Sequence, residues 1–148
     1  HVEVLHGDAN AEIRQFCARQ DWRGQRSVMF LDPYGLSVEW ETLECIRRTC
    51  AIDVWYLFPL NGLLRQMAND PASRDLDKDR SLDALLGTDR WRTELYAPVP
   101  TADMFGADPR MQRTTDQRVV LDWLTARLAS LFPYVHEPAV LRMGARHS

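Results

Sequence analysis

The residues in this sequence best suited to chemistry stand in one short turn, Asp32-Pro33-Tyr34-Gly35. The Asp32 carboxylate and the backbone carbonyl of Pro33 can each accept a hydrogen bond from an exocyclic amino group. The Tyr34 ring can stack on a flat base. Together these groups would hold an amino nitrogen with its lone pair facing a methyl donor. The alternative is a plain turn, because proline fixes φ and glycine tolerates positive φ.

A second acidic turn, Gly7-Asp8-Ala9, precedes a segment with helical spacing. In a nucleotide-binding sheet the Asp8 carboxylate would accept the adenine amino group, and the N–H of Ala9 would meet a ring nitrogen. The alternative is that Asp8 caps the following helix. Asn61 offers a polar group at the same edge of such a sheet, with helix capping again as the alternative.

Short apolar runs predict the strands that would position these turns. We predict strands over Val2–Leu5, Val28–Leu31 and Ile52–Leu57, the last two buried on both faces because their apolar runs are continuous. Apolar residues at helical spacing from Ala11 to Cys17 and from Trp40 to Cys50 predict the helices between them. Strands that alternate with helices of crossover length indicate a parallel α/β sheet. Both acidic turns would then lie at the carboxyl ends of strands, where ligands bind in open sheets.

The remainder of the chain predicts a different organisation. From 61 to 113, short apolar bursts separated by Asp, Arg, Gly and Pro predict a small helical lobe inserted after the last of these strands. Thr114 and Gln117 have the spacing of a capping box, and an apolar stripe from Val120 to Leu131 predicts a helix. One more strand is predicted over Tyr134–His136.

Composition limits the class of protein. The chain has 148 residues, 45% of them hydrophobic, with 18 basic and 21 acidic residues, so the net charge is 18 − 21 = −3. This is typical of one globular domain and excludes disordered and fibrous proteins. The longest apolar stretch, Val54–Leu60, is far shorter than the roughly 20 residues of a membrane span. We therefore expect a cytoplasmic protein with no membrane partner.

The spacing of cysteine and histidine argues against a metal site. The three cysteines, Cys17, Cys45 and Cys50, lack the close pairing of zinc ligands, and the four histidines form no ligand pair. We expect buried, reduced thiols and no bound metal.

The order of these motifs resembles the three-Cys-motif partner family, which is named for cysteines of a neighbouring partner protein. The resemblance is strongest from Val2 to Asn61. The Asp32–Gly35 turn is also similar to the Asp/Asn-Pro-Pro-Tyr and Asp-Pro-Phe-Gly motifs of enzymes that methylate base amino groups, although the second proline of the former is absent. The stretches that carry the family resemblance are Val2–Asn10, Phe30–Gly35 with Trp40, Thr42 and Leu43 after it, and Ile52–Pro59.

The resemblance implies a partial Rossmann-like methyltransferase fold with a parallel sheet, as one partial domain over residues 1–148 with the helical lobe over 61–113 inserted in it. It implies S-adenosylmethionine as the cofactor. In that sheet the strand over Val2–Leu5 would be the third. At roughly 30 residues per βαβ unit, we expect about 60 or more residues to precede it, among them the Gly-rich cofactor loop. The roles that the resemblance implies are catalytic for Asp32, Pro33 and Tyr34, cofactor-binding for Asp8 and Ala9, and substrate-binding for Tyr34 and Asn61.

The sequence leaves two main function classes open. One is an S-adenosylmethionine-dependent N-methyltransferase, for which an amino group of a nucleic-acid base is a candidate acceptor. The other is a catalytically inactive, methyltransferase-like subunit that docks a partner enzyme. A preserved cofactor loop upstream of His1 would favour the enzyme and a degraded loop the subunit, while strand ends that prove blocked would favour a plain structural domain.

Overall fold

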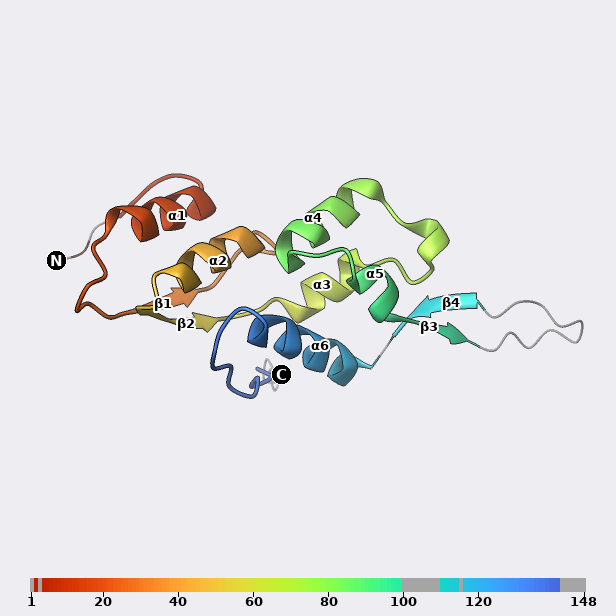
Figure 1. The fold of residues 1–148 in the computed structure, drawn as a ribbon. Coiled ribbons are helices and arrows are strands. Elements are labelled where there is room, and N and C mark those ends of the chain that lie inside the picture. The colour runs from red at the N-terminus through yellow and green to blue at the C-terminus, as the bar shows by residue number, and fades with distance from the viewer. Residues whose placement is uncertain (1, 3, 100–109, 115, 142–148) are drawn as a thin grey trace, which may run out of the picture. The chain divides into compact units, whose positions relative to one another are not determined.

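The computed structural model describes residues 2, 4–99, 110–114 and 116–141 (Figure 1). The chain divides into two compact units, His1–Thr115 and Asp116–Ser148. The described part forms six α-helices and two small sheets of two strands each, so the chain is a mixed α/β protein. None of the helices in this part is long and apolar enough to cross a membrane.

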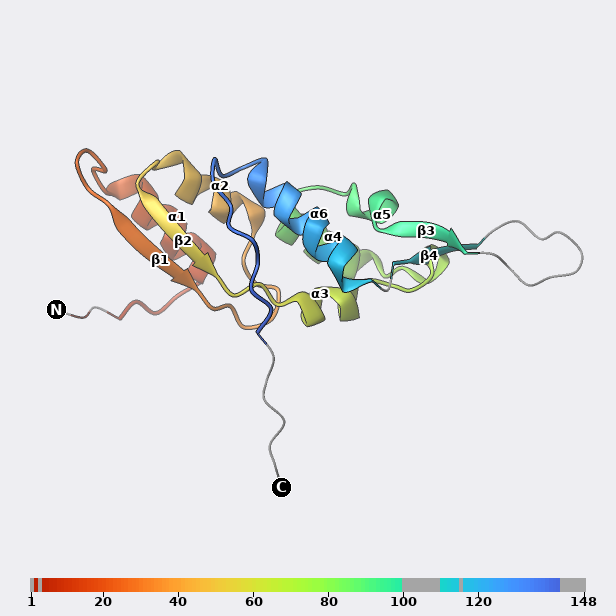
Figure 2. The same cartoon turned by 90° about the horizontal axis from the view of Figure 1, so that it is seen from below.

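The first sheet pairs β1 (Ser27–Leu31) with β2 (Ile52–Tyr56) in parallel. Ser27 lies opposite Ile52 and Leu31 opposite Tyr56, which confirms the predicted parallel pair. Two helices, α1 (Ala9–Arg19) and α2 (Trp40–Arg48), pack together on one face of the strands (Figure 2). The α2 segment returns the chain from the end of β1 to the start of β2, as a parallel pair requires.

The other face of this sheet is open, so the prediction that both strands are buried on two faces is wrong. Side chains alternate along a strand, and every second one points away from α1 and α2. On that side Val28, Phe30 and Trp55 are 66%, 62% and 67% exposed. A continuous apolar run cannot reveal that only one face of the sheet has helices packed against it.

The strand predicted over Val2–Leu5 is wrong for residues 2, 4 and 5, which are the ones described there. These residues have no regular structure, and their apolar side chains are exposed. A strand forms by hydrogen bonding to a neighbouring strand. Among the described residues β1 has β2 as its single neighbour, so nothing pairs with this segment.

The chain then enters the predicted lobe, which is helical only in part. Its helices are α3 (Leu60–Gln66), the 3-10 turn η1 (Pro71–Ser73), α4 (Leu76–Leu86) and α5 (Trp91–Glu94). They are followed by an antiparallel hairpin of β3 (Tyr96–Val99) and β4 (Arg110–Arg113), which the sequence analysis missed because each strand has only four residues. Residues 100–109 of the predicted lobe lie outside the described residues.

The apolar core of the lobe is continuous with α2, because the end of α4 at Gly87 lies against Trp40. The Arg74 guanidinium lies against this core, 5.5 Å from the ring centroid of Trp91 and 4.7 Å from that of Tyr96. Such cation–π contacts tie the segment before α4 to α5 and β3. The almost fully buried apolar residues of the lobe are Leu63, Leu82, Leu86, Trp91 and Leu95.

The second unit contains α6 (Gln117–Ala129), the helix that the apolar stripe predicts. Its N-cap is Asp116, whose side chain accepts a hydrogen bond from the N–H of Arg118 at 2.8 Å, so the capping box predicted at Thr114 is wrong. Thr114 donates its backbone N–H to the carbonyl of Leu95 at 2.9 Å and belongs to the first unit. The strand predicted over Tyr134–His136 is also wrong, because these exposed residues have no regular structure and no strand pairs with them in the described part.

Candidate functional site

The turn that follows β1 presents polar and aromatic groups that do no structural work. Gly35 has φ 67°, a value that favours glycine, and the chain turns at Gly35 and Leu36, at the end of the predicted tetrapeptide. Tyr34 is 99% exposed and Pro33 is half-buried. Asp32 is exposed and has no hydrogen-bond or ion-pair partner in the described part of the chain. An acid and a ring that stabilise nothing in the fold are free to contact a ligand.

The turn that precedes α1 confirms the capping role of Asp8. One carboxylate oxygen, Oδ1, accepts the N–H of Ala11 at 2.8 Å. The second oxygen has no partner among the described residues, and neither has the N–H of Ala9, the first residue of α1. The first N–H groups of a helix have no acceptor within it. An acceptor and a donor on adjacent residues match the amino group and ring nitrogen of adenine.

Asn61 is the second residue of α3 and is exposed. The N-cap of α3 is Pro59, so the alternative that Asn61 caps this helix is wrong. Because β1 and β2 are parallel, the segments after both strands leave the sheet at the same edge. Asn61 and the Asp32 turn therefore both follow that edge along the chain.

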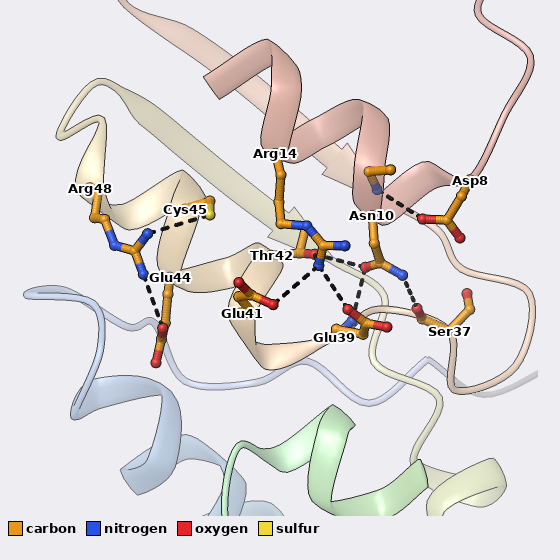
Figure 3. A network of polar contacts seen from close by, with 11 residues as sticks. Asp8, Asn10, Arg14, Ser37, Glu39, Glu41, Thr42, Glu44, Cys45 and Arg48 are labelled. Carbon is orange, nitrogen blue, oxygen red and sulfur yellow. Dashed lines mark hydrogen bonds and ion pairs between the residues drawn. The ribbon is translucent and has the colours of Figure 1, made fainter. Parts of the chain in front are cut away.

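A buried polar network joins the start of α1 to the segment that follows the Asp32 turn (Figure 3). Nδ2 of Asn10 donates to the carbonyl of Ser37 at 2.7 Å. Its Oδ1 accepts both the N–H of Glu39 at 3.0 Å and the hydroxyl of Thr42 at 2.8 Å. Asn10 is 7% exposed and Thr42 is fully buried.

An outer layer of charge covers this network. Arg14 donates to Glu39 Oε2 at 2.7 Å and to Thr42 Oγ1 at 3.3 Å, and lies 3.7 Å from Glu41 Oε2. The hydrogen bond to Glu39 is the main cause of a raised pKa of Arg14, which partial desolvation opposes. Asn10 and Thr42 thus have their side-chain polar atoms satisfied between α1, α2 and this ion pair.

The network brings two of the predicted site segments into one assembly. Asp8 and Ala9 immediately precede Asn10, and Ser37 is two residues after Gly35. The hydrogen bond from Asn10 to Ser37 therefore connects the Asp8 turn to the Asp32 turn through a few residues on each side. Sequence reasoning missed Asn10 and Thr42 as buried residues, because nothing in a local pattern distinguishes a buried amide from a solvated one.

Tyr56, the last residue of β2, carries a buried hydroxyl with no hydrogen-bond partner among the described residues. Its ring packs edge-on against Phe58, with 5.4 Å between ring centroids. Burial raises the pKa of this phenol, so it stays protonated. A buried hydroxyl without a partner costs about 1–3 kcal/mol relative to one that is hydrogen-bonded.

The three cysteines form no disulfide with one another. All three are free thiols: Cys17 is buried, Cys45 half-buried and Cys50 exposed, so the prediction of buried thiols is confirmed for Cys17 only. Burial is the main cause of the raised pKa of Cys17. No three or more Cys, His, Asp or Glu side chains gather as metal ligands within the described ranges.

Comparisons of the chain with family models, with curated proteins and with solved structures found no match. The chemistry of the site therefore rests on the groups described above.

Proposed function

We propose that this chain carries the adenine-binding and acceptor-binding parts of an S-adenosylmethionine-dependent N-methyltransferase with a Rossmann-like fold. One observation carries the proposal. Asp32 and Tyr34, directly after a strand of a parallel pair, are exposed and make no hydrogen bond or ion pair with the described residues. Ligands of open parallel sheets bind at that edge. An amino group of a nucleic-acid base fits a carboxylate acceptor with an aromatic ring beside it.

In this proposal the residues of the turn orient the acceptor. The Asp32 carboxylate and the Pro33 carbonyl accept the two N–H groups of the amino nitrogen and direct its lone pair outward. Tyr34 stacks on the ring, and Asn61 offers a further hydrogen bond. When bound, S-adenosylmethionine supplies an activated methyl group on sulfur. No general base is required in the chain, because the nitrogen becomes acidic once it is alkylated and can lose its proton to water.

Asp8 and Ala9 suit the adenine end of that cofactor. The free oxygen of Asp8 would accept the adenine amino group and the free N–H of Ala9 would donate to a ring nitrogen. One charge-assisted hydrogen bond contributes about 1.5–3 kcal/mol, whereas micromolar binding needs about 8 kcal/mol. We therefore expect this chain alone to bind S-adenosylmethionine with millimolar affinity or weaker.

A nuclear magnetic resonance titration of the chain with millimolar S-adenosylmethionine tests the cofactor part. The amides of Ala9 and Asn10 should shift, and Asp8→Asn should abolish the shift because the amide it introduces places a donor opposite the adenine amino group. The matched control is Asp116→Asn, at the N-cap of α6. No shift at Ala9 in the unmutated chain contradicts the assignment, and micromolar binding would mean that the cofactor site lies elsewhere.

Methyl transfer in the full-length protein tests the acceptor part. Asp32→Ala should remove transfer of labelled methyl to single-stranded oligonucleotides while leaving the thermal midpoint nearly unchanged. Tyr34→Ala should raise KM, whereas Tyr134→Ala, at another highly exposed tyrosine, should not. Transfer at the unmutated rate by the Asp32 variant would show that Asp32 is only a turn residue.

The open face of the β1–β2 sheet favours a second candidate, a methyltransferase-like binding subunit. Parallel sheets usually have both faces covered, and Val28, Phe30 and Trp55 leave one apolar face exposed. Methyl transfer that fails on every acceptor, together with no S-adenosylmethionine shift at Ala9, would select the subunit over the enzyme.

A further inference from the structure

We propose that Asn10 is a positioning residue, and that its hydrogen bonds to Ser37, Glu39 and Thr42 hold the Asp8 turn and the Asp32 turn together as one unit. What these two turns bind rests on the proposed function. Their mechanical coupling through Asn10 rests on the hydrogen bonds alone.

The three hydrogen bonds of Asn10 set the orientation of residues 37–42 relative to α1. Both lone-pair sites of Oδ1 are used, one by the backbone N–H of Glu39 and one by the hydroxyl of Thr42. Nδ2 is used by the backbone carbonyl of Ser37. The three bonds reach three points along residues 37–42, so they fix the orientation of this segment as well as its distance from α1. Asn10 itself is the second residue of α1, two residues after the N-cap, Asp8.

Burial makes these bonds difficult to exchange for water. Asn10 is buried and Thr42 is fully buried. A buried polar group that loses its partner is left without solvent to replace it, so the network favours the single arrangement that satisfies every member. Apolar residues at these positions would pack the helices together, but they would not set the angle between the two turns.

The two turns themselves lie at the surface, although Leu31 and Val38 on either side of the Asp32 turn are buried. Asp8, Ala9, Asp32 and Tyr34 are all exposed, so core packing does not hold them in place. The relative position of the Asp8 and Asp32 turns would therefore depend on the bonds of Asn10, which the Arg14–Glu39 ion pair supports from the surface. A cofactor fixed at Asp8 and an acceptor fixed at Asp32 react only if the two groups are held at the right separation.

Amide hydrogen exchange in Thr42→Val tests this inference without any ligand. The substitution keeps the size of the side chain and removes the hydroxyl, which donates to Asn10 and accepts a longer hydrogen bond from Arg14. Exchange should become about tenfold faster at Glu39, whose N–H is bonded to Asn10, and at Ala11 and Glu12, whose N–H groups are bonded to Asp8. Exchange in β1 should stay within twofold of the unmutated protein.

Two further variants and one control complete the test. Thr42→Ser keeps the hydroxyl and should restore slow exchange, and Asn10→Ala, which removes all three bonds, should give a larger increase than Thr42→Val at the same amides. Thr125→Val removes a hydroxyl that donates to the carbonyl of Leu121 in α6 and should change none of these amides.

The result that overturns the inference is unchanged exchange at Glu39, Ala11 and Glu12, or an increase there that β1 shares, which would show a merely global loss of stability. The S-adenosylmethionine shift at Ala9 is measured on the same samples. If the unmutated chain shows no such shift, the proposed function fails while the exchange data still decide the coupling. If the shift is present and Thr42→Val weakens it, the coupling serves the site.

Discussion

At the scale of single residues, Asp8 combines a structural role with a proposed ligand role that substitution can separate. Its Oδ1 caps α1 through the N–H of Ala11. Asp8→Ala should lower the free energy of unfolding by about 1 kcal/mol, and Asp8→Asn by much less, because asparagine caps a helix as well as aspartate does. Urea denaturation followed by circular dichroism measures both. Equal losses in the two variants would show that the charge of Asp8, and not its capping oxygen, stabilises the helix.

At the scale of elements, the end of α4 depends on the absence of a side chain at Gly87. This residue has φ 63°, and a Cβ placed on it would lie 2.2 Å from Cγ of Trp40 in α2. Gly24 has φ 70° but nothing within 4 Å of such an atom. Both Gly→Ala changes incur backbone strain of roughly 1–2 kcal/mol. Gly87→Ala should lower the free energy of unfolding by roughly 1–3 kcal/mol more than Gly24→Ala, because Trp40 must also shift. Equal effects would mean that Trp40 moves aside freely.

The N-cap of α4, Asp75, predicts that the stability of the folded protein depends on pH. The backbone N–H groups of Lys78 and Asp77 bond to the Asp75 carboxylate and lower its pKa. A pKa that is lower in the folded than in the unfolded state adds stability above the unfolded value, and this stability is lost as the pH falls through the folded value. Asp75→Asn keeps the cap but cannot titrate. The denaturation midpoint of this variant should therefore fall less between about pH 5 and about pH 2 than that of the unmutated protein. This range brackets the usual Asp pKa of about 3.9. Parallel pH curves for the two proteins would contradict a stabilising role for the Asp75 charge.

At the scale of the whole molecule, the helices of the unit His1–Thr115 cover one face of the β1–β2 sheet, and substitutions at neighbouring residues of β1 should show this difference between the faces. Phe30 is 62% exposed and Leu31 is 5% exposed. Phe30→Ala should lower the free energy of unfolding by about 1 kcal/mol or less, whereas Leu31→Ala should lower it by roughly 2–5 kcal/mol. Urea denaturation of the two variants compares them directly. A larger loss for Phe30→Ala would show that its face is covered in solution.

The elements whose evidence lies in local spacing could be predicted. Runs of β-branched and apolar residues located β1 and β2, and their separation by a helix of crossover length predicted parallel pairing. The apolar stripe from Val120 to Leu131 located α6. The short strands β3 and β4 could not be found this way, because four residues are too few for a period to emerge and Pro98 interrupts the pattern.

In the candidate site, too, the residues with a local signal in the sequence could be predicted and the others could not. Turn composition located Asp32–Gly35 and the Asp8 turn, because proline, glycine and capping acids act within a few residues of the chain. That Asp8 caps its helix and Asn61 does not was settled by where each helix begins, a difference of one or two residues that propensities do not resolve.

The sequence by itself determined which segments of this protein are helix, strand or turn wherever the cause is local: side-chain period, caps and backbone torsion preferences. Only the tertiary structure decided which elements meet. It left residues 2, 4 and 5 without a strand partner in the described part of the chain, gave the β1–β2 sheet one exposed face, and buried Asn10 and Thr42 between α1 and α2. The physical reason is that burial and hydrogen bonding depend on contacts between segments that are distant in the chain. The sequence of one segment does not determine which other segment will pack against it.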